Sequence, residues 1–201
     1  ENTIDGIGRQ PGAWGSGIHV RHSDNRNVVI AGNLLSRCGD DPHEHGIYVH
    51  SPGVLIENYL CTLAAGHGIS IRSDGIVRGN LIWNNTGCAV CYYNDWTPGE
   101  DNLLLIENNI CWDDDLSDLW HGYAHRGIVQ LKADYTDAVE HFIVRFNTLV
   151  AFQGFQPCVE VDDSLADETV DVYGNLVINP FGYYARGIDY IDAIGGNVGT
   201  S

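Results

Sequence analysis

The residues best suited to chemistry lie in one short stretch of the chain, between Cys38 and His50. Its reactive side chains are Asp40, Asp41, His43, Glu44, His45, Tyr48 and His50. Imidazole and phenol groups can take up and deliver protons near neutral pH, and a nearby cation can stabilise the negative charge that develops. These groups suit abstraction of the proton next to the carboxyl group of a sugar acid (a uronate). His43 or His45 would be the base and Tyr48 the acid.

Two strings that recur along the chain predict the elements that position this cluster. In the first string a small residue precedes alternating apolar positions, as in Gly17–Val20, Gly46–Val49 and Gly68–Ile71. In the second string an Asn stands between apolar positions, at Ile30–Leu35, Val77–Ile82, Ile106–Cys111, Val144–Leu149 and Val172–Val177. Such alternation is typical of short β-strands, and its repetition at irregular spacing predicts stacked coils with insertions in their loops.

Stacking assigns the inward positions of the first string to one column, filled by Ile18, Ile47, Ile69, Cys88, Ile128 and Ile188. We expect the recurring Asn residues at sharp corners, in the left-handed conformation, with their amides bonded from coil to coil. Tyr59 occupies the Asn position of one copy. The cysteines predict no disulfide framework, because Cys61 and Cys111 share an inward column. Cys88 and Cys91 should point to opposite faces of a strand, which argues against a metal site there.

The opposite phase of the same strands points outward and forms a predicted groove. One outward column holds His19, Tyr48 and Ser70, and the next holds Arg21, His50, Arg72 and Cys91. Coils stack about 4.8 Å apart, so the basic side chains of the second column would form a line beside the loop that carries the cluster. In this interpretation Arg72 or Arg21 holds the substrate carboxylate. The other predicted contacts to the sugar chain are His19, His50 and His67.

These strings resemble those of the right-handed parallel β-helix proteins of the pectate-lyase-like superfamily, most clearly at His45–Val49 and His67–Ile71. In addition, the stretch Asp41–Glu44 reads Asp-Pro-His-Glu and is similar to the DPHE motif of the mannuronan (alginate) epimerases. It stands in the same place relative to its coil, after an Asn-containing string and before the next strand. This second resemblance implies that Asp41 and His43 are catalytic.

Two positions differ from the pattern of the epimerase family. Cys38 stands three residues before the motif Asp, where the family has a Tyr, and Arg72 stands about where the family has an Asp on the following coil. If the reaction survives these changes, Tyr48 would act in place of the missing Tyr. A lyase-like elimination, or a changed substrate, is then as good a prediction as epimerisation.

The predicted fold is all-β, a right-handed parallel β-helix of about seven coils with an Asn ladder, in a single domain over residues 1–201. The sequence begins and stops within a coil, at Asn2–Ile4 and Asn197–Val198. We therefore expect a piece of a longer solenoid, or open coil ends that neighbouring domains or self-association cover.

The overall charge narrows the choice of partner and compartment. A formal net charge of −17 argues against nucleic acid and anionic membranes as partners, and no apolar run is long enough to insert into a membrane. An acidic surface is typical of secreted proteins, so we expect an extracellular or periplasmic location. The predicted partner is a polysaccharide or oligosaccharide.

One large insertion and its surroundings add acidic and aromatic side chains. The acidic residues are Asp113, Asp114 and Asp115, and the aromatic ones are Trp96, Trp112 and Trp120. The acidic triplet could bind calcium through its carboxylate oxygens or form a solvated loop, and no other cofactor is predicted. The flat rings suit the apolar faces of sugars, and they would serve equally as a lid on the flank of the solenoid.

Three functions are compatible with these observations. The leading interpretation is a polysaccharide lyase or epimerase that acts on a uronate-containing polysaccharide by His-mediated proton abstraction. The first alternative is a non-catalytic carbohydrate-binding or structural module, such as a segment of an adhesin or a spike. The second alternative is a glycoside hydrolase that uses paired carboxylates drawn from Asp40, Asp41 and Asp74.

Overall fold

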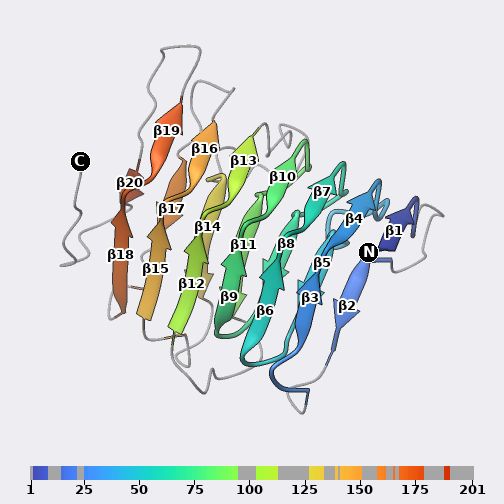
Figure 1. Ribbon diagram of the computed structural model, residues 1–201, viewed down its shortest axis with the longest axis horizontal. Coiled ribbons are helices and arrows are strands. Elements are labelled where there is room, and N and C mark those ends of the chain that lie inside the picture. Colours follow the sequence, from blue (N-terminus) through green and yellow to red (C-terminus); the bar gives the residue numbers. More distant parts are fainter. Residues whose placement is uncertain are drawn as a thin grey trace.

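Parallel strands dominate the computed structural model of the chain. It describes residues 2–8, 15–21, 25–94, 103–112, 127–133, 139, 141–150, 158–161, 165, 168–178 and 188–190. Within these ranges twenty strands form three parallel sheets that run side by side along the molecule (Figure 1). No helix in the described ranges is long and apolar enough to cross a membrane.

Each coil adds one strand to each sheet, so every sheet collects every third strand of the chain. The first sheet consists of β1 (Asn2–Asp5), β4 (Asn33–Ser36), β7 (Leu60–Thr62), β10 (Leu81–Trp83), β13 (Ile110–Trp112), β16 (Thr148–Val150) and β19 (Leu176–Ile178). The second consists of β2 (Ile18–Val20), β5 (Ile47–Val49), β8 (Ile69–Ile71), β11 (Val90–Asn94), β14 (Val129–Ala133), β17 (Val159–Val161) and β20 (Ile188–Tyr190). The third consists of β3 (Val29–Ala31), β6 (Val54–Glu57), β9 (Gly75–Arg78), β12 (Leu103–Glu107), β15 (His141–Arg145) and β18 (Thr169–Tyr173). The predicted all-β parallel solenoid of about seven coils is confirmed.

The inward face of the second sheet carries one column of branched apolar residues. Its members pair in register from coil to coil, and they are Ile18, Ile47, Ile69, Val90, Val129 and Val159. The predicted column was wrong at Cys88 and Ile128, because the fourth strand begins later than the string suggested. Gly87 is the counterpart of Gly66, and each leaves room for a His of the preceding coil.

The correction of register also moves Cys91. Cys91 pairs with Ser70 across β8 and β11, so it belongs to the column of His19 and Tyr48 and not to the column of Arg72. Cys88 lies just before β11, and its backbone N–H donates to the ring of His67 at 2.9 Å. The two cysteines therefore do not alternate across one strand, as the sequence interpretation assumed.

A ladder of Asn amides runs along one corner of the solenoid, as predicted. The Nδ2 group of Asn80 donates to Oδ1 of Asn109 at 2.9 Å, Asn109 donates to Asn147 at 3.0 Å, and Asn147 donates to Asn175 at 2.9 Å. Each of these Nδ2 groups also donates to a backbone carbonyl of the preceding coil, as Asn109 does to Val77 at 3.0 Å. The ladder thus satisfies polar groups that would otherwise be buried without partners.

The left-handed residue of this corner is the residue before the Asn, which corrects the expectation that the Asn itself takes that conformation. At this corner the positions just before the ladder column have φ between 52° and 64°, and they are Gly32, Asn58, Gly79, Asn108, Phe146 and Gly174. The Asn of the ladder contributes its side-chain amide, while its neighbour makes the turn.

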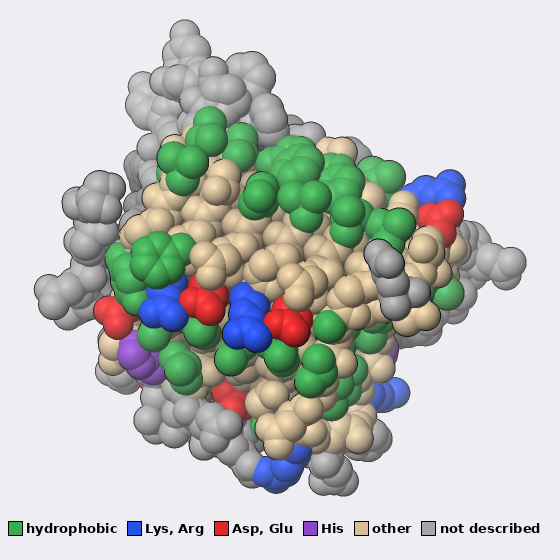
Figure 2. Space-filling model, in the orientation of Figure 1, with side chains coloured by type: hydrophobic (Ala, Val, Ile, Leu, Met, Phe, Trp, Pro, Cys, Tyr) green, Lys and Arg blue, Asp and Glu red, His purple; other side chains and the backbone are tan. Residues whose placement is uncertain are grey.

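Side chains of alternating charge lie in a line on the third sheet, next to the corner that carries the Asn ladder (Figure 2). Arg78 donates to Glu57 at 2.8 Å, and Arg145 pairs with Glu107 at 2.7 Å. Figure 2 shows basic and acidic side chains alternating in a line on this face. Surface ion pairs that stay partly open to solvent add little to stability, so the Asn ladder carries more of the polar contribution at this corner.

Replacement of Asn109 by Ala tests the ladder. Asn109 is 1% exposed, and its loss leaves the amide of Asn80 and the carbonyl of Val77 without their partner. We expect the free energy of unfolding in urea to fall by about 2–4 kcal/mol. The matched control is Asn33→Ala, where the amide hydrogen bonds are exposed, and it should cost less than about 1 kcal/mol. Equal losses in the two variants would contradict the account.

Candidate functional site

The loop between β4 and β5 is held by a buried carboxylate. Glu44 is 4% exposed and accepts hydrogen bonds from the backbone N–H groups of Gly15 at 2.6 Å, Asp40 at 2.7 Å and Asp41 at 3.2 Å. Gly39 has a φ of 80°, and a Cβ there would lie 2.5 Å from Cβ of Glu44. Glu44 therefore has a structural role, which is to fold the loop that presents Asp41 and His43.

Asp41 and His43 form a compact pair at the tip of this loop. One carboxylate oxygen of Asp41 accepts the backbone N–H of His43 at 2.9 Å and lies 2.8 Å from Nδ1 of the same residue. A carboxylate favours the tautomer in which Nδ1 carries the proton, so Nε2 carries the lone pair. The side chains of His43 and Asp41 are 73% and 58% exposed, and a ligand can reach this imidazole.

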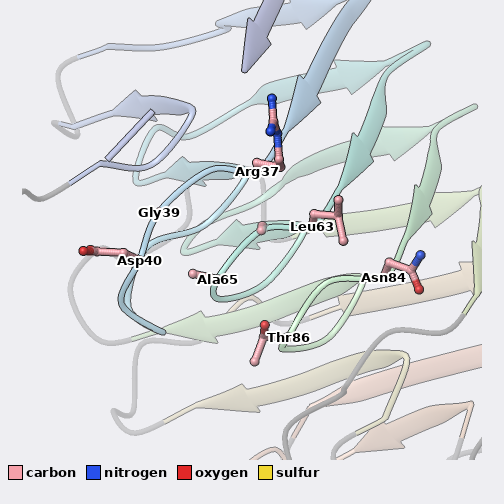
Figure 3. Close-up of a pocket in the computed structure, with 8 residues that line it drawn as sticks. Arg37, Gly39, Asp40, Leu63, Ala65, Asn84 and Thr86 are labelled. Carbon is pink, nitrogen blue, oxygen red and sulfur yellow. The ribbon is translucent and has the colours of Figure 1, made fainter. Parts of the chain in front are cut away.

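An open pocket of about 600 Å³ lies beside the same loop (Figure 3). Its lining residues are Arg37, Gly39, Asp40, Leu63, Ala64, Ala65, Asn84 and Thr86. They come from the turns that follow β4, β7 and β10, where Arg37, Leu63 and Asn84 take a φ between 52° and 58°. Partial desolvation and the neighbouring Glu44 carboxylate raise the pKa of Asp40. Neither Asp41 nor His43 is among the residues that line this pocket.

Tyr48 is the centre of an aromatic cluster on the outer face of the second sheet. Its ring centroid lies 4.9 Å from that of His19, 5.1 Å from that of His45 and 4.4 Å from that of His50. These rings come from β2, from β5 and from the residues that flank β5. The predicted outward groups of the first two coils therefore do come together.

Arg72 adds a cation to this cluster. Its guanidinium carbon lies 5.0 Å from the ring centroid of Tyr48 and 4.6 Å from that of Tyr93, and its Nη1 donates to the carbonyl of Tyr93 at 2.8 Å. Two aromatic faces and a backbone acceptor fix the position of this charge. Arg21, the other predicted cation, is exposed just after β2.

His45 and His67 form part of the stack itself. Their rings lie 5.0 Å apart and nearly parallel, Nδ1 of His45 accepts the backbone N–H of His67 at 3.0 Å, and Nδ1 of His67 accepts that of Cys88. Both rings are buried, at 4% and 7% exposure. Since Nδ1 is an acceptor, Nε2 carries the proton, and neither ring presents a basic nitrogen to the loop. The sequence left open whether His43 or His45 is the base, and the structure favours His43.

Three of these imidazoles are kept neutral by their surroundings. Burial lowers the pKa of His45 well below its ordinary value, and the neighbouring charge of Arg72 acts in the same direction. Burial and Arg72 lower the pKa of His50 to about 4, and burial and Arg21 lower the pKa of His19. The outer face of the second sheet therefore carries these three neutral imidazole rings next to the cationic side chains of Arg72 and Arg21.

Several predicted residues are not part of this arrangement. Trp112 lies on the first sheet, stacked on Trp83 with ring centroids 5.0 Å apart, and so away from the second sheet. Asp74 is fully buried at the turn between β8 and β9, whereas Asp40 and Asp41 lie at a different corner of the coil. Those lying outside the described residues are Trp96, Trp120, Asp113, Asp114 and Asp115. Among the residues that are described, no group of three or more His, Cys, Asp and Glu is arranged to hold a metal ion.

Sequence reasoning missed two contributors to this face. Tyr93, which holds Arg72, follows from correct alignment of the fourth strand, and its signal was the alternation of Val90, Tyr92 and Asn94. Gln130 follows Cys91 in the outward column of the next coil. Tyr93 was missed because Gly87 resembles the start of a strand, whereas Gln130 follows the longest gap between strands, from Trp112 to Val129, so the spacing of the strings gave no guide to it.

Comparison with known proteins addresses the fold. The model of the family described as "Right handed beta helix region" matches residues 1–110, which is more than half of the 201 residues. This match agrees with the three parallel sheets and indicates that the coils are right-handed. No curated protein and no solved structure matches the chain.

The neutral histidines predict an acid-sensitive fold. The ordinary pKa of an imidazole is about 6.5, so in the unfolded chain His45 and His50 bind protons below that pH, while in the fold they do not. The unfolded state then binds more protons, and the free energy of unfolding falls as the pH falls from about 6.5 to about 4.

NMR titration of the imidazole signals and urea unfolding at several pH values would check this dependence. We expect His50 to titrate near pH 4 and the variant His50→Gln to show a shallower loss of stability over the same range. A His50 midpoint near the ordinary value, or a stability that does not change between these pH values, would show that the rings are not held neutral.

Proposed function

Because this chain belongs to the right-handed β-helix family, we propose that it is a carbohydrate-active protein that abstracts the proton next to the carboxyl group of a uronate within a polysaccharide. The observation that carries the proposal is the exposed pair of Asp41 and His43, with Nδ1 of the imidazole 2.8 Å from the carboxylate. The polysaccharide lies across the outer face of the second sheet, in an extracellular or periplasmic setting.

The base in this proposal is Nε2 of His43. Asp41 holds the ring in the tautomer that leaves the lone pair on Nε2, and it stabilises the imidazolium that forms when the proton arrives. A positioned carboxylate behind an imidazole is the arrangement that general bases use. His45 holds the neighbouring coils together and takes no proton.

Negative charge on the uronate carboxylate grows as the proton leaves, and fixed cations on this face offset it. Arg72 is held between Tyr48 and Tyr93, so its charge is positioned before the substrate binds. Arg21 extends the line of positive charge along the sheet. This local strip of positive charge would allow a protein of negative net charge to bind a negatively charged polymer.

Tyr48 is the proton donor in the second half of the reaction. Its ring lies 5.1 Å from that of His45, which follows His43 by two residues in the chain. A proton delivered to the leaving oxygen completes an elimination, and a proton delivered to the opposite face of the sugar ring completes an epimerisation. Both outcomes use the same base and the same cations.

Substitution of the pair tests the proposal. With alginate or pectin as substrate, we expect His43→Gln to lower the rate by about 100-fold or more and Asp41→Asn to lower it by a smaller factor, because the amide no longer fixes the tautomer. The rate is measured as ultraviolet absorbance of unsaturated uronate, and as sugar configuration by NMR when no absorbance develops.

The matched control is His141→Gln. His141 also pairs with a carboxylate, with Nε2 3.0 Å from Oδ2 of Asp171, but it lies on the third sheet. This variant should keep the full rate. If His43→Gln retains the rate of the unmodified chain, the base is elsewhere. If no uronan is changed but oligosaccharides still bind to this face, the protein is a non-catalytic binding module.

A further inference from the structure

Three of the ten basic residues of the chain lie in one column on the outer face of the second sheet. The strand residues that precede this column pair in register from coil to coil, and they are Val20, Val49, Ile71, Tyr92 and Leu131. In the order of the coils, the column itself reads Arg21, His50, Arg72, Tyr93 and Lys132. A cation therefore stands at every second coil, and an aromatic ring stands at each coil between.

Lys132 is the only lysine of the chain, and it extends the row beyond the two arginines. Its Nζ lies 5.7 Å from the ring centroid of Tyr93, and the guanidinium carbon of Arg72 lies 4.6 Å from the same centroid. Arg72 belongs to the coil before Tyr93 and Lys132 to the coil after it. The tyrosine thus acts as a spacer that attracts both cations to its ring.

The rings between the cations are neutral near neutral pH. Burial and Arg72 lower the pKa of His50 to about 4, and a phenol such as that of Tyr93 has an ordinary pKa of about 10. Within the described residues the column holds no carboxylate, although the formal net charge of the chain is −17. The positive charges of the column are therefore separate points along the solenoid, each two coils from the next.

We propose that Arg21, Arg72 and Lys132 are three successive carboxylate subsites for one acidic polysaccharide chain, which runs along the solenoid axis and turns a carboxylate to the sheet at every second sugar. Coils stack about 4.8 Å apart, so neighbouring subsites are about 9.6 Å apart. The rise of one sugar in an extended chain is close to that of one coil. The inference rests on the proposed function for the nature of the ligand.

The aromatic positions of the column suit the sugar that lies between two carboxylates. That sugar meets the ring of His50 or Tyr93, and an aromatic ring packs well on the apolar C–H face of a sugar. Two kinds of polymer supply one carboxylate on the same side at every second sugar. One is a uronate homopolymer with equatorial linkages, in which each sugar is turned over relative to its neighbour. The other is a copolymer in which uronate and neutral sugars alternate.

Calorimetric titration with oligosaccharides of increasing length tests the subsites. The ligands are mannuronate oligomers for the homopolymer and hyaluronan oligomers for the alternating copolymer, and the protein carries His43→Gln so that no ligand is consumed. A chain of three sugars spans two cations, and one of five sugars spans all three. We expect the affinity to rise by about fivefold to tenfold from three to five sugars. It should rise little with further length.

Lys132→Gln, added to the same protein, assigns the third subsite. It should abolish the gain from three to five sugars and change the affinity for three sugars by no more than about twofold, because Arg21 and Arg72 still hold the shorter chain. The matched control is Arg78→Gln, which also removes one positive charge but lies on the third sheet. It should leave the gain intact. An equal effect of Lys132→Gln at every length, or no effect, would overturn the proposal.

The two ligand series and a separate assay of proton loss distinguish the possible failures. A length step with one series alone identifies that polymer as the one the spacing fits. A length step in binding without loss of the uronate ring proton in the unmodified chain would support the subsites and contradict the proposed catalysis. Proton loss without a length step in either series would leave the catalysis standing and overturn the subsites. Failure of both series to bind would overturn both.

Discussion

Backbone hydrogen bonding between successive coils is the constraint on which the rest of the molecule depends. Every strand is paired in parallel with the equivalent strand of the coil before it or after it, so the position of a residue within its coil decides which side chains lie beside it. In the core this produces columns of Ile and Val. On the outside it joins Tyr48, Arg72 and Tyr93, which are distant in sequence, into one cluster. A shift of one residue would exchange the inward and outward faces of a strand, and so the chemistry of the site and the stability of the fold depend on the same register.

The same constraint divides the histidines into two kinds. His45 and His67 each use Nδ1 to accept a backbone N–H of the next coil, and Gly66 and Gly87 leave the space that these rings need. Such rings are buried, neutral and part of the scaffold. His43 lies on the loop that Glu44 anchors, outside the stack, and its Nδ1 is engaged by a carboxylate instead. The loop histidine is exposed and its Nδ1 lies against a carboxylate, which is why the proposed chemistry assigns the base to it and not to the buried rings.

Much of this arrangement could be predicted from the sequence, because period-2 alternation and a repeated Asn have few structural explanations. The coil number, the Asn ladder and the outward phase of Tyr48 all follow from those patterns. The prediction failed where a glycine had two possible meanings. Gly87 resembles the start of a strand, but it is small because the ring of His67 fills the space beside it. The resulting register error placed Cys88 and Cys91 on opposite faces. The role of Glu44 was also beyond prediction, since its three backbone partners come from loops whose path no periodicity describes.

The central claim is that the face beside the Asp41–His43 pair removes the ring proton next to the carboxyl group of a uronate. The most direct measurement is the NMR signal of that proton in alginate or pectin incubated with the protein in deuterated water. Elimination removes the proton and epimerisation replaces it with deuterium, so both reactions deplete the signal. The account predicts that the signal decays with the unmodified chain and persists with His43→Gln. A signal that stays intact with the unmodified chain on both polymers would contradict it.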